Sequence, residues 1–183
     1  MIQIRNEQKS DYQIVEDITR EAFYNMYVPG CMEHYLVHIM RGHEDFIPEL
    51  DFVLELDGKV IGNIMYTKAK LTDENGEEKE IITFGPVSIL PKYQQMGYGK
   101  LLMEHSFKLA VELGYDTIVI FGSPAKEFKE VAFDGRKWTY SGSPVMVGDG
   151  QEAARFDDAL PPMAKEYRPS QDEFYIISQA FLG

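Results

Sequence analysis

The chain is short of cysteine, of basic residues and of long apolar runs, and each shortage excludes a class of protein. Its single cysteine, Cys31, cannot form an internal disulfide, and no Cys/His spacing near it predicts a structural zinc site. No stretch approaches the ~20 apolar residues of a membrane helix, and residues 1–9 lack the apolar block of a signal peptide. We therefore expect a cytoplasmic protein without membrane association, in which Cys31 is buried as a small apolar residue.

Acidic residues outnumber basic ones, with 30 Asp and Glu against 18 Lys and Arg and a formal charge of -12. The resulting field repels phosphate backbones and anionic membranes, which argues against a nucleic-acid partner. It attracts cationic amines, although solubility explains an acidic surface as well. The chain of 183 residues is 44% hydrophobic, enough for one sizeable core, and is too short for two ordinary domains. We expect a single domain over residues 1–183.

The amino-terminal part predicts one strand and two helices. Ile2 and Ile4 alternate with polar residues as in a short strand, and residues 10–13 have the pattern of a helix cap. A helix is expected from about residue 11, and Pro29-Gly30 separates it from a second short helix over residues 32–40. One face of the first helix is expected to be core: Ile14, Val15, Ile18, Ala22 and Phe23.

The middle of the chain predicts an antiparallel meander followed by a parallel strand. Asp57-Gly58 joins two strand-like segments, and Asn75-Gly76 joins the second to a strand that ends at Leu90. A helix then runs to a stop at Gly114, and residues 117–121 form the next strand. Because a helix connects them, this strand and the one ending at Leu90 should run parallel.

The segment from Pro91 to Lys100 is the most informative part of the chain, because a strand ends before it and a helix begins within it. Gly97 and Gly99 therefore lie at a helix N-terminus. Backbone amides and the helix dipole there form an anion site that needs no basic side chain. A Gly-x-Gly pair serves tight turns and close helix packing equally well.

Two phosphate-binding motifs do not fit these glycines. A dinucleotide-binding fingerprint requires a third glycine at position 102, which is Leu102. A Walker loop requires a different glycine spacing before Lys100 and a Ser or Thr after it.

The pattern that does match is Gln-x-x-Gly-x-Gly, at Gln94, Gly97 and Gly99, directly after a strand and Leu90-Pro91. It resembles the acetyl-CoA loop of the GCN5-related N-acetyltransferase (GNAT) superfamily, over about residues 2–124. The resemblance implies an α+β fold in three layers. A mixed, mostly antiparallel sheet is then flanked by helices, with a parallel strand pair splayed around the CoA site.

The resemblance also implies an activity: transfer of an acetyl group from acetyl-CoA to a primary amine of a small molecule or peptide, by direct attack in a ternary complex. Val87, Ser88 and Ile89 would then pair with the pantetheine arm of CoA, and a backbone amide near Ile89 would polarise the thioester carbonyl. Gln94 would order the turn. The pyrophosphate would lie on the loop amides of Gln95, Met96, Gly97, Tyr98, Gly99 and Lys100. A non-catalytic acyl-CoA-binding or regulatory module is the alternative, and a scaffold protein is a third possibility.

The sequence suggests several side chains for the acceptor site but assigns a role to none of them. In the superfamily the first helix pair borders the acceptor site, so Tyr24, Tyr27 and His34 could line its entrance, although helically spaced aromatic residues are also typical of packing. His34 and His38 share a helix face, but no third ligand is evident and we expect no metal. Glu55 and Glu80 lie on expected strands and suit solvent-facing positions, so the general base stays unassigned.

The resemblance breaks after Pro124, where the chain runs directly into a segment similar to the later tail of the superfamily. Two explanations account for this join. Either the protein has an internal deletion, or a disordered stretch of the protein is missing from the sequence and the residues on its two sides are written as neighbours. The missing turn usually carries the tyrosine that protonates CoA thiolate, and Tyr140 does not take its place. Trp138 and Tyr140 suit sheet packing or a homodimer contact. Ser170 and Glu173 predict a cap for a short helix over residues 174–181.

Overall fold

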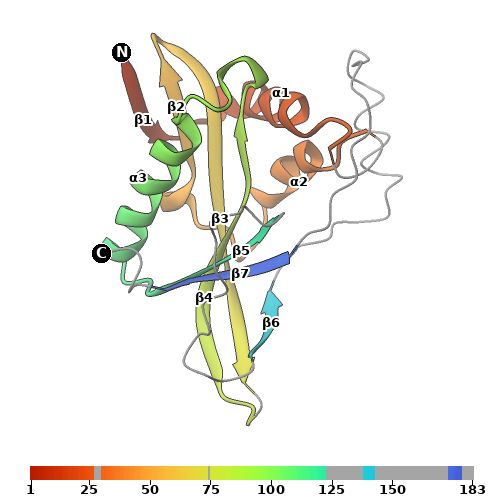
Figure 1. Cartoon of the computed structure of the whole chain (residues 1–183), viewed down its shortest axis with the longest axis vertical. Coiled ribbons are helices and arrows are strands. Elements are labelled where there is room, and N and C mark those ends of the chain that lie inside the picture. Colours follow the sequence, from red (N-terminus) through yellow and green to blue (C-terminus); the bar gives the residue numbers. More distant parts are fainter. Residues whose placement is uncertain (27–29, 74, 123–137, 143–172, 179–183) are drawn as a thin grey trace.

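Figure 1 presents the fold as a computed structural model, which describes residues 1–26, 30–73, 75–122, 138–142 and 173–178. The helices within these ranges are α1 (Tyr12–Phe23), α2 (Glu33–Met40) and α3 (Tyr98–Glu112), with short 3-10 turns at Lys9–Asp11, Pro48–Leu50 and Pro91–Tyr93. The strands are β1 (Ile2–Asn6), β2 (Phe52–Leu56), β3 (Lys59–Asp73), β4 (Glu78–Ile89), β5 (Thr117–Gly122), β6 (Trp138–Gly142) and β7 (Glu173–Ser178). None of these helices has the length and apolar content that a bilayer crossing requires.

The described strands form one mixed sheet in the order β1-β2-β3-β4-β5-β7, with β6 paired to the far half of β3. Every pairing is antiparallel except that of β4 with β5, which is parallel. The predicted meander and its parallel neighbour are therefore confirmed. The two hairpin turns form as the sequence predicts, with positive φ at Asp57, Gly58 and Gly76.

Helices cover both faces of the sheet, as Figure 1 shows for α3 on one side of β3 and β4 and for α1 and α2 on the other. The hydroxyl of Thr19 on α1 contacts Asn63, whereas Ser106 on α3 contacts the hydroxyl of Tyr66. Because successive side chains of a strand alternate between faces, Asn63 and Tyr66 lie on opposite faces of β3. The predicted three-layer arrangement is thus confirmed.

Two details of the first helix differ from the sequence-based expectation. The helix begins at Tyr12, but the capping box forms one turn earlier: the Asp11 carboxylate accepts a hydrogen bond from the Gln8 amide at 2.8 Å, and Ser10 caps nothing. Ile14 is exposed, because the buried stripe follows Val15 and Ile18 and leaves Ile14 at its margin. Cys31 is buried as expected, and burial raises the pKa of its thiol to about 12.

The helix expected over residues 174–181 is wrong, because Glu173–Ser178 forms the strand β7 against β5. The segment Phe174-Tyr175-Ile176-Ile177 is rich in aromatic and β-branched residues, which favour a strand. The segment pairs with an edge of β5 that would otherwise be open. The capping signal of Ser170 and Glu173 gives no information about such a pairing.

The strand β4 contains a bulge at Gly85-Pro86. Phe84 pairs with Tyr66 and Val87 with Ile64, so two residues of β4 lie opposite Met65 alone. Pairing with β5 involves only Ile82 and Thr83, before the bulge. Among the described strands, the end of β4 beyond the bulge is therefore paired with β3 on one side and with none on the other, which is the predicted splay.

Gly62 on β3 allows this end of β4 to approach closely. A Cβ at Gly62 would lie 2.4 Å from Ile89 Cδ1 and 2.7 Å from the Ser88 carbonyl oxygen. Both separations are shorter than van der Waals contact, so only glycine fits here without a shift of β4.

Buried carboxyl groups meet where β1, α1, α2 and β2 come together. Arg41 donates hydrogen bonds to Glu7 at 2.7 and 2.8 Å and to Glu16 at 2.7 Å, and its side chain and both carboxylates are buried. Asp51 is buried beside them. Burial and the neighbouring Glu7 carboxyl raise the pKa of Asp51 well above its usual range. We infer that Asp51 holds a proton at neutral pH.

The substitution Gly62→Ala should destabilise the fold by about 2 kcal/mol, because the added methyl group forces β4 away from β3. Urea unfolding measures the loss. Gly42→Ala is the matched control, since a Cβ there would lie 3.6 Å from the Ile39 carbonyl oxygen, an ordinary contact. Equal losses in the two variants would contradict the close approach at Gly62.

The substitution Asp51→Asn should reduce the pH dependence of stability. An unfolded aspartate has a pKa of about 3.9, so folding takes up a proton at Asp51 above that pH and becomes less favourable as pH rises. Asparagine needs no proton, and the variant should gain up to about 1.4 kcal/mol per pH unit over the wild type between about pH 5 and pH 8. Urea unfolding at several pH values checks this, with Asp45→Asn on a partly exposed carboxyl as control. A pH-independent difference would mean that Asp51 is ionised.

Candidate functional site

The end of β4 presents backbone groups that none of the described strands pairs with. The Leu90 amide donates to the Ile61 carbonyl at 2.9 Å, so by the alternation of an antiparallel ladder Ser88 also directs its N–H and C=O toward β3. Val87 and Ile89 then direct theirs to the open side, where β5 has diverged. Of the three β4 residues predicted for this site, Val87 and Ile89 expose the backbone and Ser88 is the residue that attaches it to β3.

The turn after β4 is held by Gln94. Its Nε2 donates a hydrogen bond to the Ile89 carbonyl oxygen at 2.9 Å and spans the 3-10 turn at Pro91–Tyr93. The ordering role expected of Gln94 agrees with this contact. It occupies the Ile89 carbonyl, so the groups left to the open side are the Ile89 amide and both backbone groups of Val87.

The loop ends at the N-terminus of α3, where the cap residue Gly97 has a left-handed backbone with φ 87° and no side chain to cap the helix. Helical residues Tyr98, Gly99 and Lys100 follow. A left-handed residue before a right-handed one turns successive N–H groups inward and forms an anion-binding nest. The first-turn amides of a helix have no intrahelical acceptor. The predicted segment therefore presents convergent donors at one point.

Two further residues of the loop are exposed. Gln95 has a positive φ of 61°, a conformation that is uncommon for a residue with a side chain, and the sequence pattern gave no signal of it. Met96 is 64% exposed between Gln95 and Gly97. A non-glycine residue held in this conformation is a feature that functional loops often carry.

Gly99 and Gly97 differ in what surrounds them. A Cβ at Gly99 would lie 3.7 Å from Ile89 Cγ1, an ordinary contact, so Gly99 brings the helix against β4 but is not required by sterics. A Cβ at Gly97 would meet no atom within 4 Å, and only the backbone conformation favours glycine there. Close helix packing is therefore a weak explanation for either residue.

Two lysines lie near the loop, and both keep their positive charge. Lys100 lies 3.6 Å from Glu104 and both are largely exposed, and the Lys92 ammonium stacks over the Tyr93 ring at 4.9 Å. A surface ion pair of this kind is weak. An anion at this site would thus meet the backbone amides of the loop together with these two ammonium groups, in a protein of formal charge -12.

The residues predicted near the acceptor fall in different places. His34 is fully buried, which agrees with the packing alternative and not with a place at the acceptor entrance. The Arg20 guanidinium stacks over the half-buried Tyr24 ring at 5.5 Å, and Tyr27 lies outside the described residues. His38 pairs with Glu16 at 3.0 Å. Within the described ranges, no group of three His, Cys, Asp or Glu side chains converges on a metal site.

The described part offers no clear general base. Glu55 accepts hydrogen bonds from Arg5 at 2.6 and 3.0 Å, and Glu80 is exposed at the far end of β4. After Glu80, β4 carries no ionisable side chain, and neither does β5. The chain after Pro124, with the proposed internal deletion, lies outside the described residues until β6, and the side chain of Tyr140 is not among those described.

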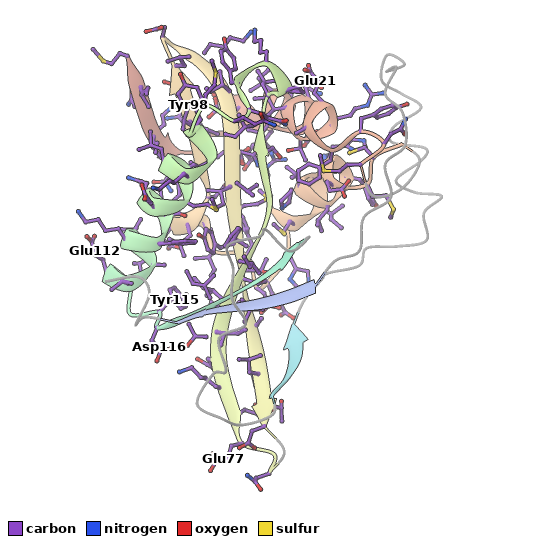
Figure 2. The ribbon with its side chains drawn as sticks, in the orientation of Figure 1. Glu21, Glu77, Tyr98, Glu112, Tyr115 and Asp116 are labelled. Atoms are coloured by element: carbon purple, nitrogen blue, oxygen red, sulfur yellow. The ribbon has the colours of Figure 1, made fainter. Side chains whose placement is uncertain are left out.

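A hollow of about 520 Å³ lies elsewhere, with Lys68, Glu80 and Tyr115 among its lining residues. Figure 2 shows Tyr115 near one end of α3 and Tyr98 at the other, so this hollow is far from the loop. It shares no residue with the site described above.

Sequence reasoning missed three residues that shape the site: Gly62, Thr19 and Asn63. A lone glycine inside a strand is a recognised signal of close backbone approach and would have identified Gly62. Thr19 and Asn63 carry no such signal, because their contacts join elements that are far apart in the sequence.

Comparison with known proteins agrees with this geometry. The sequence model of the acetyltransferase (GNAT) family matches residues 12–131. The uncharacterised N-acetyltransferase YjhQ of Escherichia coli (strain K12) is 26% identical over 114 residues, which are 62% of this chain and 60% of that protein. The chain thus spans about 60% of the length of this curated relative.

Two solved structures share the fold at about the same identity. A GNAT family acetyltransferase from Brucella melitensis, in complex with acetyl-CoA, is 25% identical, with a TM-score of 0.60 over 81% of this chain and 94% of that one. The GNAT family N-acetyltransferase YhbS from Escherichia coli, in complex with CoA, is 26% identical, with a TM-score of 0.57 over 68% of this chain and 64% of that one. With a family match over well more than half of its length, and with the splayed β4–β5 pair in place, the chain belongs to the GNAT family of acetyltransferases.

Proposed function

We propose that the chain transfers an acetyl group from acetyl-CoA to a primary amine of a small molecule or peptide. Two observations carry this proposal: Val87 and Ile89 direct backbone groups away from β3 toward a side where no described strand pairs with them, and the uncapped N-terminus of α3 follows after one short turn. An extended pantetheine arm needs a strand edge, and a pyrophosphate needs convergent amides. Relatives of about 25% identity are solved with acetyl-CoA or CoA, which supports the same ligand here.

In the proposed reaction, the amine nitrogen attacks the thioester carbonyl carbon while both substrates are bound. The C–N bond forms, the C–S bond breaks, the CoA thiolate takes up a proton and the nitrogen loses one. Holding the two reactants at attack distance supplies ~7 kcal/mol or more of the barrier reduction. The free Ile89 amide stabilises the negative charge that develops on the carbonyl oxygen.

A second candidate function is a non-catalytic acyl-CoA-binding module. The observation that favours it is that β5, and β4 after Glu80, carry no ionisable side chain. Such a protein would bind acetyl-CoA with the same backbone groups but would lack a general acid or base.

The substitution Gly97→Ala should weaken acetyl-CoA binding by about tenfold, equivalent to about 1.4 kcal/mol, because alanine resists the left-handed backbone that aims the loop amides. Calorimetric titration measures the dissociation constant. Gly114→Ala is the matched control at the other end of α3: its φ is 92°, and no atom lies within 4 Å of its Cβ position. Both variants should lose similar stability, and only Gly97→Ala should lose affinity. If the two variants bind equally well, the loop does not hold the pyrophosphate.

Release of CoA thiol in the presence of a panel of primary amines distinguishes the two candidate functions. An enzyme should release thiol in proportion to one or a few amines, and Gly97→Ala should raise the KM for acetyl-CoA. A wild-type protein that binds acetyl-CoA but acetylates no small-molecule or peptide amine would favour the binding module.

A further inference from the structure

The part of β4 that presents Val87 and Ile89 has few attachments to the rest of the molecule. The bulge at Gly85-Pro86 precedes it and the turn at Pro91 follows it. A central strand normally has two neighbouring strands, and within the described part of the chain this segment pairs only with β3. A segment of this length needs additional contacts if its backbone is to be held at a fixed position.

One such contact is a buried chain of hydroxyl groups under α1. The Ser88 hydroxyl donates to Thr19 Oγ1 at 3.1 Å, and the Thr19 hydroxyl donates to Asn63 Oδ1 at 3.3 Å. Thr19 and Asn63 are 0% exposed and Ser88 is 1% exposed. The chain therefore links α1, β3 and β4 at the residue between Val87 and Ile89.

A contribution to stability does not explain why these buried side chains are polar. Its members lie near Ile18 and Ile64 in the main core, where apolar side chains of similar size would pack without any polar group to satisfy. The Asn63 Nδ2 atom is buried without a hydrogen-bond partner in the described part, which is itself unfavourable. A directional contact instead fixes one relative position of the helix and the strand, which apolar packing does less strictly.

We infer that Thr19 is a positioning residue for acetyl-CoA, which it influences by holding Ser88. This inference rests on the proposed function. The Ser88 backbone faces β3 and its side chain faces α1, so its position is fixed from two directions. The free backbone groups of Val87 and Ile89, on either side of Ser88, are held in place as a consequence.

Three variants on α1 test the inference. Thr19→Val keeps the shape of the side chain and removes the hydroxyl, Thr19→Ser keeps the hydroxyl, and Ile18→Val is a neighbouring core change outside the polar chain. Calorimetric titration gives the acetyl-CoA dissociation constant of each variant. Hydrogen exchange of a peptide covering residues 84–90 reports how firmly β4 is held, and thermal unfolding reports overall stability. Ser88→Ala provides a second route to the same contact if Thr19→Val does not fold.

Thr19→Val and Ser88→Ala should weaken acetyl-CoA binding about tenfold and speed exchange in residues 84–90, because a misplaced strand no longer matches its ligand. Thr19→Ser should stay within about twofold of the wild type in affinity. Ile18→Val should lower the unfolding temperature without either effect. Unchanged affinity and exchange in Thr19→Val, or an equal loss in Ile18→Val, would overturn the inference. If the wild type itself binds no acetyl-CoA, the proposed function fails, while the exchange measurement still decides whether Thr19 holds β4.

Discussion

The structure depends on one constraint: among the strands that the structure describes, β4 has a neighbour on both sides along part of its length and on one side only beyond Gly85-Pro86. The bulge allows β5 to diverge, and the divergence leaves the Val87 and Ile89 backbone free. Three other features of the site hold this end in place. Gly62 lets it lie close to β3, Gln94 occupies the carbonyl of its last residue, and Thr19 holds the side chain of Ser88.

Local sequence patterns were sufficient for most of the strands, helices and turns, and the family resemblance carried by the loop implied the layers and the candidate site. Turn dipeptides such as Asp57-Gly58 and the loop residue Gly97 have backbone conformations that few other residues adopt, so their effect is visible without the rest of the chain. The parallel pairing of β5 followed from the helix between it and β4.

Features that depend on distant partners were not predictable in this way. The segment after Glu173 has a capping signal, yet β7 forms because β5 offers it an edge. The burial of His34 and the contact of Thr19 with Ser88 depend on the position in which α1 and α2 pack against the sheet. The left-handed backbone of Gln95 is imposed by the turn around it. Pattern and propensity describe a residue's own preference, whereas these outcomes were decided by neighbours from elsewhere in the sequence.

The contacts of Ile89 have an evolutionary consequence. Its side chain occupies the space that glycine leaves at Gly62 on β3 and also lies against Gly99 on α3. Positions 62, 89 and 99 therefore share one volume across a strand, its neighbour and a helix. In related sequences a larger residue at position 62 would require both a smaller residue at position 89 and a shift of the strand that carries the position 88 carbonyl, so position 62 should stay glycine more strictly than positions 89 and 99 keep their residues.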